Sequence, residues 1–383
     1  MTGRRRCLQV VASALAGAAL GRGWAAPAPA PGVGLPPLAR GFNLAHWFEY
    51  ERTQPLDGAE LQALARMGLD HVRLPLDPLV CGWRLDAPRR LPFLADLHRV
   101  LDLAQAAGLT TVVDLHLAPE RKATIEGNGA HERALAELWS ALGAALRSRP
   151  VATLAFELFN EPQYYGLEGW RWPGVQRMLL AALRAQAPEH RVLLSGARGG
   201  NLEGLLALTP ERDAAAAYTF HFYEPFIFTH QAIPWLDERW TSAGTRRQVL
   251  YPARLNREHP PTVLRAHPKG PQEWADFLAK DWRAEVVASS FAEAAAWGSR
   301  HGVPVLCNEF GVIRAQVDVA SRYRWLKDVR LAAEAHGIGW TVWDYTHIFG
   351  LTQQSGEAGH AGRRVLDAEA WDALGLVRPR AAG

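Results

Sequence analysis

The stretch FELFNEPQYY, residues 156–165, places an amide and a carboxylate, Asn160 and Glu161, directly after an apolar run. The run itself has the composition of a buried strand. The same arrangement returns in VPVLCNEFGV, residues 303–312, where Glu309 follows a second apolar run. The two stretches predict two buried strands that each lead into a glutamate. They raise the question whether both glutamates belong to one site.

Short apolar runs of this kind recur along the chain and alternate with longer amphipathic stretches. The eight expected strands cover residues 41–47, 70–76, 110–117, 152–161, 191–196, 216–223, 303–311 and 338–345. Apolar residues recur every three or four positions between them, which predicts helices over 57–67, 93–107, 131–148, 170–187, 272–299 and 319–336. A short connection at 197–215 and a weak helical pattern near 366–375 complete the series.

Eight strand–helix repeats predict an α/β fold, a single (β/α)8 TIM barrel. An open, doubly wound sheet is the alternative, but no glycine-rich phosphate loop follows the first expected strand. The region 224–270, after the sixth strand, is rich in proline, aromatic and charged residues. A loop of this length predicts a functional lid or binding loop.

The N-terminal segment has the pattern of an export signal. Basic residues Arg4 and Arg5 precede an apolar stretch, and small residues follow, which resembles a twin-arginine signal over residues 1–26. A lead-in rich in proline and alanine covers 27–37, and the catalytic domain is expected over 38–378. This organisation predicts a bacterial protein that is exported to the periplasm or beyond and that stays off the membrane after signal removal.

Composition excludes several classes of protein. The 383 residues carry a net charge of only +3, which argues against a nucleic acid partner. Of the three cysteines, Cys7 lies in the leader, and Cys81 and Cys307 are expected to be buried free thiols. No Cys/His spacing is typical of a zinc site. The 15 tryptophans suggest a large aromatic core or a surface for sugars.

Polar residues stand at the ends of most expected strands, where a barrel of this kind opens onto its active face. They are His46 and Trp47, Arg73, His116, Asn160 and Glu161, His221 and Tyr223, Glu309, and Trp343. Each has a structural explanation by itself; Arg73, for example, could pair with Glu157 inside the barrel. Their common position favours one site. Two carboxyl groups across a cleft suit glycoside hydrolysis, with a gap of about 5–5.5 Å for retention of configuration and about 6.5–9.5 Å for inversion.

The motifs around these residues resemble those of glycoside hydrolase family 5, the cellulase family. The matching motifs are VRLP, DLH, FNEP, HFYEP, NEFG and TVWDY, in that order along the chain. The resemblance implies a retaining β-glycosidase in which Glu161 is the acid/base and Glu309 the nucleophile. It also implies that substrate is bound by Arg73, His116, Asn160, His221, Tyr223 and Trp343. A raised pKa is expected for Glu161, because this carboxyl group must donate a proton.

Aromatic residues near the strand ends suggest an extended cleft, and hence a polysaccharide substrate. They are Trp47, Phe48, Tyr50, Tyr164, Tyr165, Phe226, Phe228, His230 and Trp235. His46 and Trp47 are counted among the substrate-binding candidates. The expected activity is that of a monomeric endo-β-1,4-glucanase that needs no metal or organic cofactor.

Several alternatives stay open. The β-glycan specificity could instead be that of a mannanase, an exo-β-1,3-glucanase or a transglycosylase. A non-catalytic glycan-binding barrel is an alternative from another class of protein. A third is a metal-dependent barrel hydrolase built on His116 and His221.

Overall fold

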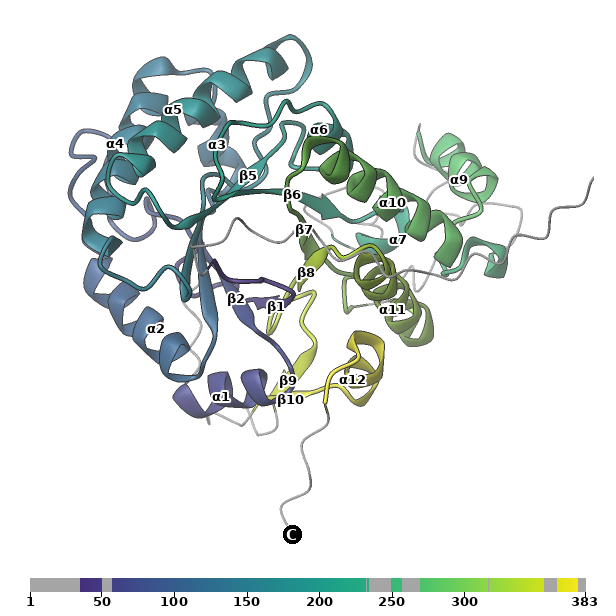
Figure 1. The fold of residues 1–383 in the computed structure, drawn as a ribbon. Coiled ribbons are helices and arrows are strands. Elements are labelled where there is room, and N and C mark those ends of the chain that lie inside the picture. Colours follow the sequence, from purple (N-terminus) through teal and green to yellow (C-terminus); the bar gives the residue numbers. More distant parts are fainter. Residues whose placement is uncertain are drawn as a thin grey trace, which may run out of the picture.

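Figure 1 shows the fold of the chain in a computed structural model. The structure describes residues 35–49, 57–231, 233, 249–256, 269–315, 317–354 and 364–377. The predicted leader, residues 1–26, and the aromatic candidates Tyr50 and Trp235 lie outside the described residues, as does much of the loop 224–270.

Eight parallel strands close into a barrel in which each strand pairs with the next and β8 pairs with β1. The strands are β1 (Arg40–Asn43), β2 (His71–Leu76), β3 (Thr110–Leu115), β4 (Leu154–Glu157), β5 (Arg191–Ser195), β6 (Ala216–Phe222), β7 (Val305–Phe310) and β8 (Gly339–Val342). All eight expected strands are therefore present, and the predicted TIM barrel is confirmed.

Helices surround the barrel, as Figure 1 shows. The larger ones are α1 (Gly58–Arg66), α2 (Leu94–Ala106), α4 (Gly129–Leu146), α5 (Trp172–Arg184), α10 (Ala284–His301) and α11 (Val319–Ala335). Shorter elements are α3 (Pro119–Ile125), η1 (Gly166–Arg171), α6 (Leu202–Leu206), α7 (Phe226–Thr229), η3 (Ala253–Leu255), α9 (Gly270–Ala279) and α12 (Ala368–Leu374). A hairpin of β9 (Thr352–Gln354) and β10 (Arg364–Leu366) follows β8.

Side chains inside the barrel divide into an apolar layer and a polar layer. The apolar cluster contains Leu38, Val112, Ala155, Leu193, Ala217 and Leu306. Further along the strands the interior is polar, because Arg73, Asp114 and Glu157 are all buried there. A much larger hydrophobic core fills the space between barrel and helices. The polar layer therefore lies toward the C-terminal ends of the strands, where active sites of this fold are built.

One helix prediction is wrong. The amphipathic stretch 272–299 forms two helices, α9 and α10, rather than one. Between them Asp281 adopts a left-handed conformation, with φ of 48°, and Arg283 is fully extended. Trp282 is buried at this corner and carries the Lys280 ammonium group over its ring. Burial of this tryptophan overrides the helical periodicity of the sequence.

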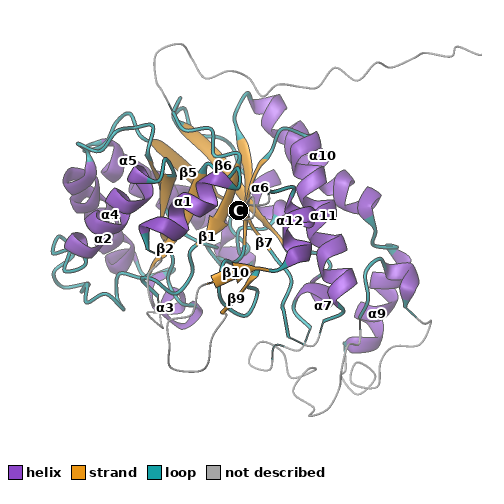
Figure 2. Ribbon diagram, turned by 90° about the horizontal axis from the view of Figure 1, so that it is seen from below, coloured by secondary structure: helices purple, strands orange, loops and turns teal. Residues whose placement is uncertain are grey.

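The short elements α3 and α7 and the β9–β10 hairpin lie toward one end of the barrel (Figure 2). They follow β3, β6 and β8 in the chain, so this is the end at which the strands terminate. Cys81 and Cys307 are buried free thiols, as predicted. Within the described part of the chain, no helix is both long enough and apolar enough to span a membrane.

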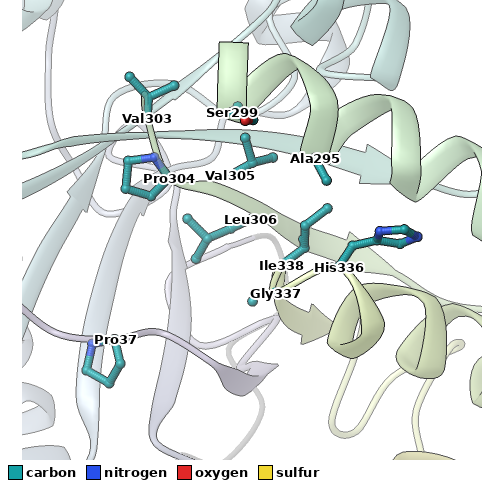
Figure 3. Close-up of a pocket in the computed structure, with 12 residues that line it drawn as sticks. Pro37, Ala295, Ser299, Val303, Pro304, Val305, Leu306, His336, Gly337 and Ile338 are labelled. Atoms are coloured by element: carbon teal, nitrogen blue, oxygen red, sulfur yellow. The ribbon is translucent and has the colours of Figure 1, made fainter. Parts of the chain in front are cut away.

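A small cavity of about 120 Å³ lies at the opposite end of the barrel (Figure 3). It is lined by Pro37 and by residues at the starts of β7 and β8, such as Val303 and Ile338. Its lining is largely apolar, and the predicted site residues are all elsewhere. The cavity therefore belongs to the packing between barrel and helices.

Candidate active site

Arg73 on β2 is the centre of the polar layer, and its side chain is fully buried. Its Nε and Nη2 atoms donate to the two carboxylate oxygens of Glu157, at 2.7 and 2.8 Å. Nη1 donates to Glu309 Oε1 at 2.6 Å, and Nη2 donates to Asn160 Oδ1 at 2.8 Å. Asp114 Oδ2 lies 2.9 Å from Nη2. Arg73 thus makes the structural pair with Glu157 and also contacts the two predicted site residues Asn160 and Glu309.

A bulge in β7 brings Glu309 to this arginine. The pairing of β6 with β7 shifts by one residue between Phe220 and His221, so that Asn308 is the extra residue. Side chains normally alternate between the two faces of a strand, but the bulge lets two successive residues point inward. Asn308 Nδ2 donates to Glu157 Oε2 at 2.8 Å, while Glu309 reaches Arg73.

The second oxygen of Glu309 is also held. Tyr223 donates its hydroxyl proton to Glu309 Oε2 at 3.0 Å. Burial and the neighbouring carboxylate of Glu309 raise the pKa of Tyr223 well above its usual range, so this hydroxyl remains a donor at ordinary pH. Arg73 and Tyr223 therefore fix the Glu309 carboxylate from two sides.

Glu161 follows β4 and has a positive φ of 45°, which is uncommon for a residue with a side chain. Its Oε1 lies 2.9 Å from Nδ1 of His221. The ammonium group of Lys122, on α3, donates to the backbone carbonyl of Glu161 at 3.2 Å and lies 3.7 Å from Oε2. Lys122 thus holds both the backbone and the side chain of this residue.

The expected raised pKa of Glu161 is not found in the free protein. Burial would raise the pKa, but the hydrogen bond from His221 and the positive charge of Lys122 outweigh it and lower the pKa of Glu161 below its ordinary value. The physical reason is that both neighbours stabilise the ionised carboxylate. The carboxylate side chain is 36% exposed, so a ligand can reach it.

The two glutamates are brought together, which answers the question raised by the sequence. A carboxylate oxygen of Glu161 lies within 4.8 Å of one of Glu309. Nδ1 of His221 lies between them, 2.9 Å from Glu161 Oε1 and 3.3 Å from Glu309 Oε2. The nearest oxygens of the two groups therefore approach more closely than the gap of about 6.5–9.5 Å that separates the carboxyl groups of inverting enzymes.

His116 and Trp343 lie next to each other on another side of the site. Their rings are stacked, with centroids 5.4 Å apart and an interplanar angle of 13°. His116 Nδ1 lies 2.8 Å from Asp114, and its Nε2 lies 3.1 Å from Asn160 Nδ2. Trp343 is partly exposed and offers a flat apolar surface next to polar groups, which is the arrangement that suits a sugar ring.

The remaining aromatic candidates divide by exposure. Trp47 is only 7% exposed and stacks on Phe48 within the core, so its ring is not a free platform for sugar. Tyr164 and Phe228 are buried as well. Tyr165 and Phe226 are exposed, and Tyr165 helps to line a hollow of about 450 Å³ that also includes Gln163 and Arg171. This hollow lies beside the loop that carries Glu161.

Several residues that complete the site were missed in the sequence. Lys122 lies on α3, which no periodicity indicated. Glu49 is buried and accepts a hydrogen bond from the backbone of His46 at 2.6 Å, and its Oε1 lies 3.7 Å from His116. Asn43 accepts from Arg73 at 2.9 Å. Asn43 is the last residue of β1, but in the sequence it fell inside the expected strand 41–47 and was not singled out.

Comparison with known proteins agrees with this geometry. Residues 37–347 match the model of the cellulase family, glycosyl hydrolase family 5. Endoglucanase 3 of Fibrobacter succinogenes is 25% identical over 337 residues, which cover 82% of this chain but only half of that protein. Endoglucanase C of Acetivibrio thermocellus is 26% identical over 323 residues, which cover 80% of this chain and 90% of that protein.

The fold is also similar to that of solved enzymes. A hyperthermophilic endo-β-1,4-glucanase, whose structure was determined with substrate, superimposes with a TM-score of 0.69 at 22% identity. The comparison covers 88% of this chain and 97% of that one. The family match extends over more than half of the chain and includes Arg73, Glu161 and Glu309. The chain therefore belongs to the cellulase family, glycosyl hydrolase family 5.

Proposed function

We propose that this protein is a retaining endo-β-1,4-glucanase. The observation that carries the proposal is the separation of Glu161 and Glu309, whose carboxylate oxygens come within 4.8 Å of each other. A short gap places one carboxylate close enough to attack the sugar itself, as a retaining mechanism requires. Two relatives that match over most of this chain are named endoglucanases.

In the first step, Glu309 attacks the anomeric carbon and Glu161 gives a proton to the leaving glycosidic oxygen. The products are a covalent ester between sugar and Glu309, and a released sugar chain with a free hydroxyl group. Arg73 and Tyr223 hold the attacking carboxylate in one orientation, which lowers the cost of reaching the reactive geometry.

In the second step, Glu161 is ionised and takes a proton from a water molecule, which attacks the same carbon and releases Glu309. The lowered pKa of Glu161 in the free protein suits this second role. The hydrogen bond from His221 favours the ionised form of Glu161. For Glu161 to donate a proton in the first step, contact with substrate must replace this hydrogen bond. His221 contacts both carboxylates and therefore helps to fix their relative position.

A polymeric substrate is supported by the surface around the site. Trp170 and Tyr165 are 78% and 62% exposed, and both follow β4 on the active face. Exposed aromatic rings next to a hollow bind sugar rings by apolar contact.

The first test is a screen of soluble β-1,4-glucan, mixed-linkage glucan, β-1,3-glucan, xyloglucan and mannan, with Glu309→Gln protein as the blank. We expect a ladder of oligosaccharides from β-1,4-glucan, and first-formed products with the β-anomeric configuration by NMR. Release of mono- or disaccharides alone would indicate exo action. Activity on mannan or β-1,3-glucan alone would move the protein to another specificity, and α-anomeric products would contradict the retaining mechanism.

We also propose that the protein acts outside the cytoplasm of a bacterial cell. The proposal rests on the basic, apolar and small-residue segments of residues 1–26. Replacing Arg4 and Arg5 together by lysine should leave the protein in the cytoplasmic fraction if the twin-arginine route is used. Unchanged export of that variant would exclude this route.

A further inference from the structure

A second cluster of metal-binding side chains lies beside the active site. It consists of His46, which follows β1, and of Asp344 and His347, which follow β8. One donor atom from each residue lies within 4.8 Å of those of the other two. Because β1 pairs with β8 to close the barrel, the two loops meet at this point. The rings of His46 and His347 are 3.8 Å apart between centroids.

Two side-chain atoms of this cluster are buried without a hydrogen-bond partner among the described residues. They are Oδ2 of Asp344, a residue that is 0% exposed, and Nδ1 of His46, which is 8% exposed. The other oxygen of Asp344 accepts from the backbone N–H of His347 at 3.1 Å. Buried polar atoms are almost always paired, so an unpaired carboxylate oxygen beside an unpaired imidazole nitrogen calls for a ligand.

The catalytic carboxylates form a comparable cluster with His221, but the atoms there are already used. Glu309 accepts from Arg73 and Tyr223, and Glu161 is held by His221 and Lys122. The contrast distinguishes a site that works by proton transfer from one in which His46 Nδ1 and Asp344 Oδ2 have no partner among the described residues.

We propose that His46, Asp344 and His347 bind one divalent transition-metal ion, of which Zn²⁺ is the best match. Two imidazoles and one carboxylate form a donor set that such ions favour. Bonds of about 2.1 Å require donor atoms no more than about 4 Å apart, so the side chains must draw closer together when the ion binds. The inference does not rest on the proposed glucanase activity.

The surrounding charges are compatible with a cation. Glu49 faces the cluster through its bond to the His46 backbone, and its charge acts on Asp344 together with that of the buried Arg322. Arg322 donates to the carbonyls of Phe349 and Gly350, so it is occupied with the loop itself.

The ion would connect two loops that carry predicted substrate-binding residues. His46 is one of them, and Trp343 immediately precedes Asp344 in the chain. Trp343 stacks on His116, so a fixed Asp344 also fixes this aromatic surface. We therefore assign the ion a positioning role beside the reacting carboxylates.

The test uses the untagged full chain, stripped with a chelator and titrated with Zn²⁺ by calorimetry and with Co²⁺ by visible absorption. We expect one ion per chain and a higher melting temperature with Zn²⁺. His347→Gln and Asp344→Asn should each weaken binding by more than about 100-fold, since loss of even an outer partner of a metal ligand costs about 10- to 100-fold. His301→Gln, which removes an exposed histidine from the end of α10, should bind as the parent does.

Two results would overturn the proposal. One is the absence of stoichiometric binding to the parent chain. The other is metal binding that is retained in both His347→Gln and Asp344→Asn. If Glu161→Gln then abolishes binding, the ion sits at the catalytic carboxylates instead. Asp344 is buried, so circular dichroism must show that its variant folds; the half-buried His347 provides the second, milder variant.

Discussion

Carboxylate oxygens of Glu161 and Glu309 lie within 4.8 Å of each other, although the two residues come from β4 and β7 and are 148 positions apart in the sequence. Their surroundings are not equivalent. Glu309 is almost fully buried against Arg73, whereas the side chain of Glu161 is 36% exposed. This asymmetry suits a fixed nucleophile and a proton donor that must reach the leaving group.

Replacing either glutamate by glutamine should abolish most of the activity and leave the fold intact. We expect a loss of about 10²–10⁴-fold for Glu161→Gln, the usual contribution of a general acid–base group, and a larger loss for Glu309→Gln, because no ester can form. Initial rates on soluble β-1,4-glucan measure both effects, and circular dichroism checks the fold.

An aryl β-cellobioside with a good leaving group separates the two roles. Such a leaving group departs with little help from an acid, so the first step should be impaired far less in Glu161→Gln than on glucan. Glu309→Gln should be equally inactive on both substrates. If the aryl substrate and the glucan respond alike to Glu161→Gln, the assignment of the proton donor is wrong.

Replacing Arg73 should damage stability as well as catalysis. The change Arg73→Met leaves Asp114, Glu157 and Glu309 close together and buried without their common cation. Breaking a buried ion pair by removing one partner costs about 3–5 kcal/mol, which denaturant unfolding would measure. Arg84→Ala is the matched control, since its pair with Asp86 is solvent-exposed; a comparable loss there would refute the special role of the buried network.

The sequence predicted the barrel because each strand is a separate apolar run and each helix has a clear periodicity. The error at 272–299 arises from Trp282, whose burial against neighbouring elements turns the chain where local preference alone would continue a helix. The small element α3 was missed for a related reason. Its seven residues are too few to show a helical period, and it is held by contacts to other loops.

For the site, motifs identified the residues whose type is dictated by the chemistry, such as Asn160, Glu161 and Glu309. They could not identify residues that lie outside every motif and reach the site only because the chain folds. Lys122 and Glu49 belong to no motif, and only the fold places them beside Glu161 and His116. The sequence also could not show that Trp47 turns into the core, because an apolar ring near a strand end suits packing and sugar binding equally.

Tyr223→Phe should lower kcat more than it changes KM. The substitution removes the hydroxyl that donates to Glu309 and keeps the ring that packs on His230. A hydrogen bond to a charged group contributes about 1.5–3 kcal/mol, which corresponds to a loss of about 10- to 150-fold. Steady-state kinetics on one oligosaccharide would show the split, and a rise in KM alone would mean that Tyr223 acts only on substrate binding.

Lys122→Met should move the alkaline limit of activity to higher pH. Catalysis begins with Glu161 protonated. The Lys122 ammonium group lies 3.7 Å from the Glu161 carboxylate. Together with His221 and His116, it lowers the pKa of Glu161. Removing this charge raises that pKa, so the protonated form persists to higher pH. We expect a shift of about one pH unit in the upper limb of the kcat profile, which reports the pKa of Glu161 in the substrate complex. One unit is the low end of what a neighbouring opposite charge causes, because the carboxylate is partly exposed. Lys122→Arg is the matched control, because it keeps the charge and should keep the upper limb at the same pH.

Two results would contradict this prediction. If the upper limb moves equally in both variants, the cause is the lost hydrogen bond with the Glu161 carbonyl. If it does not move in Lys122→Met, this lysine does not set the pKa of Glu161.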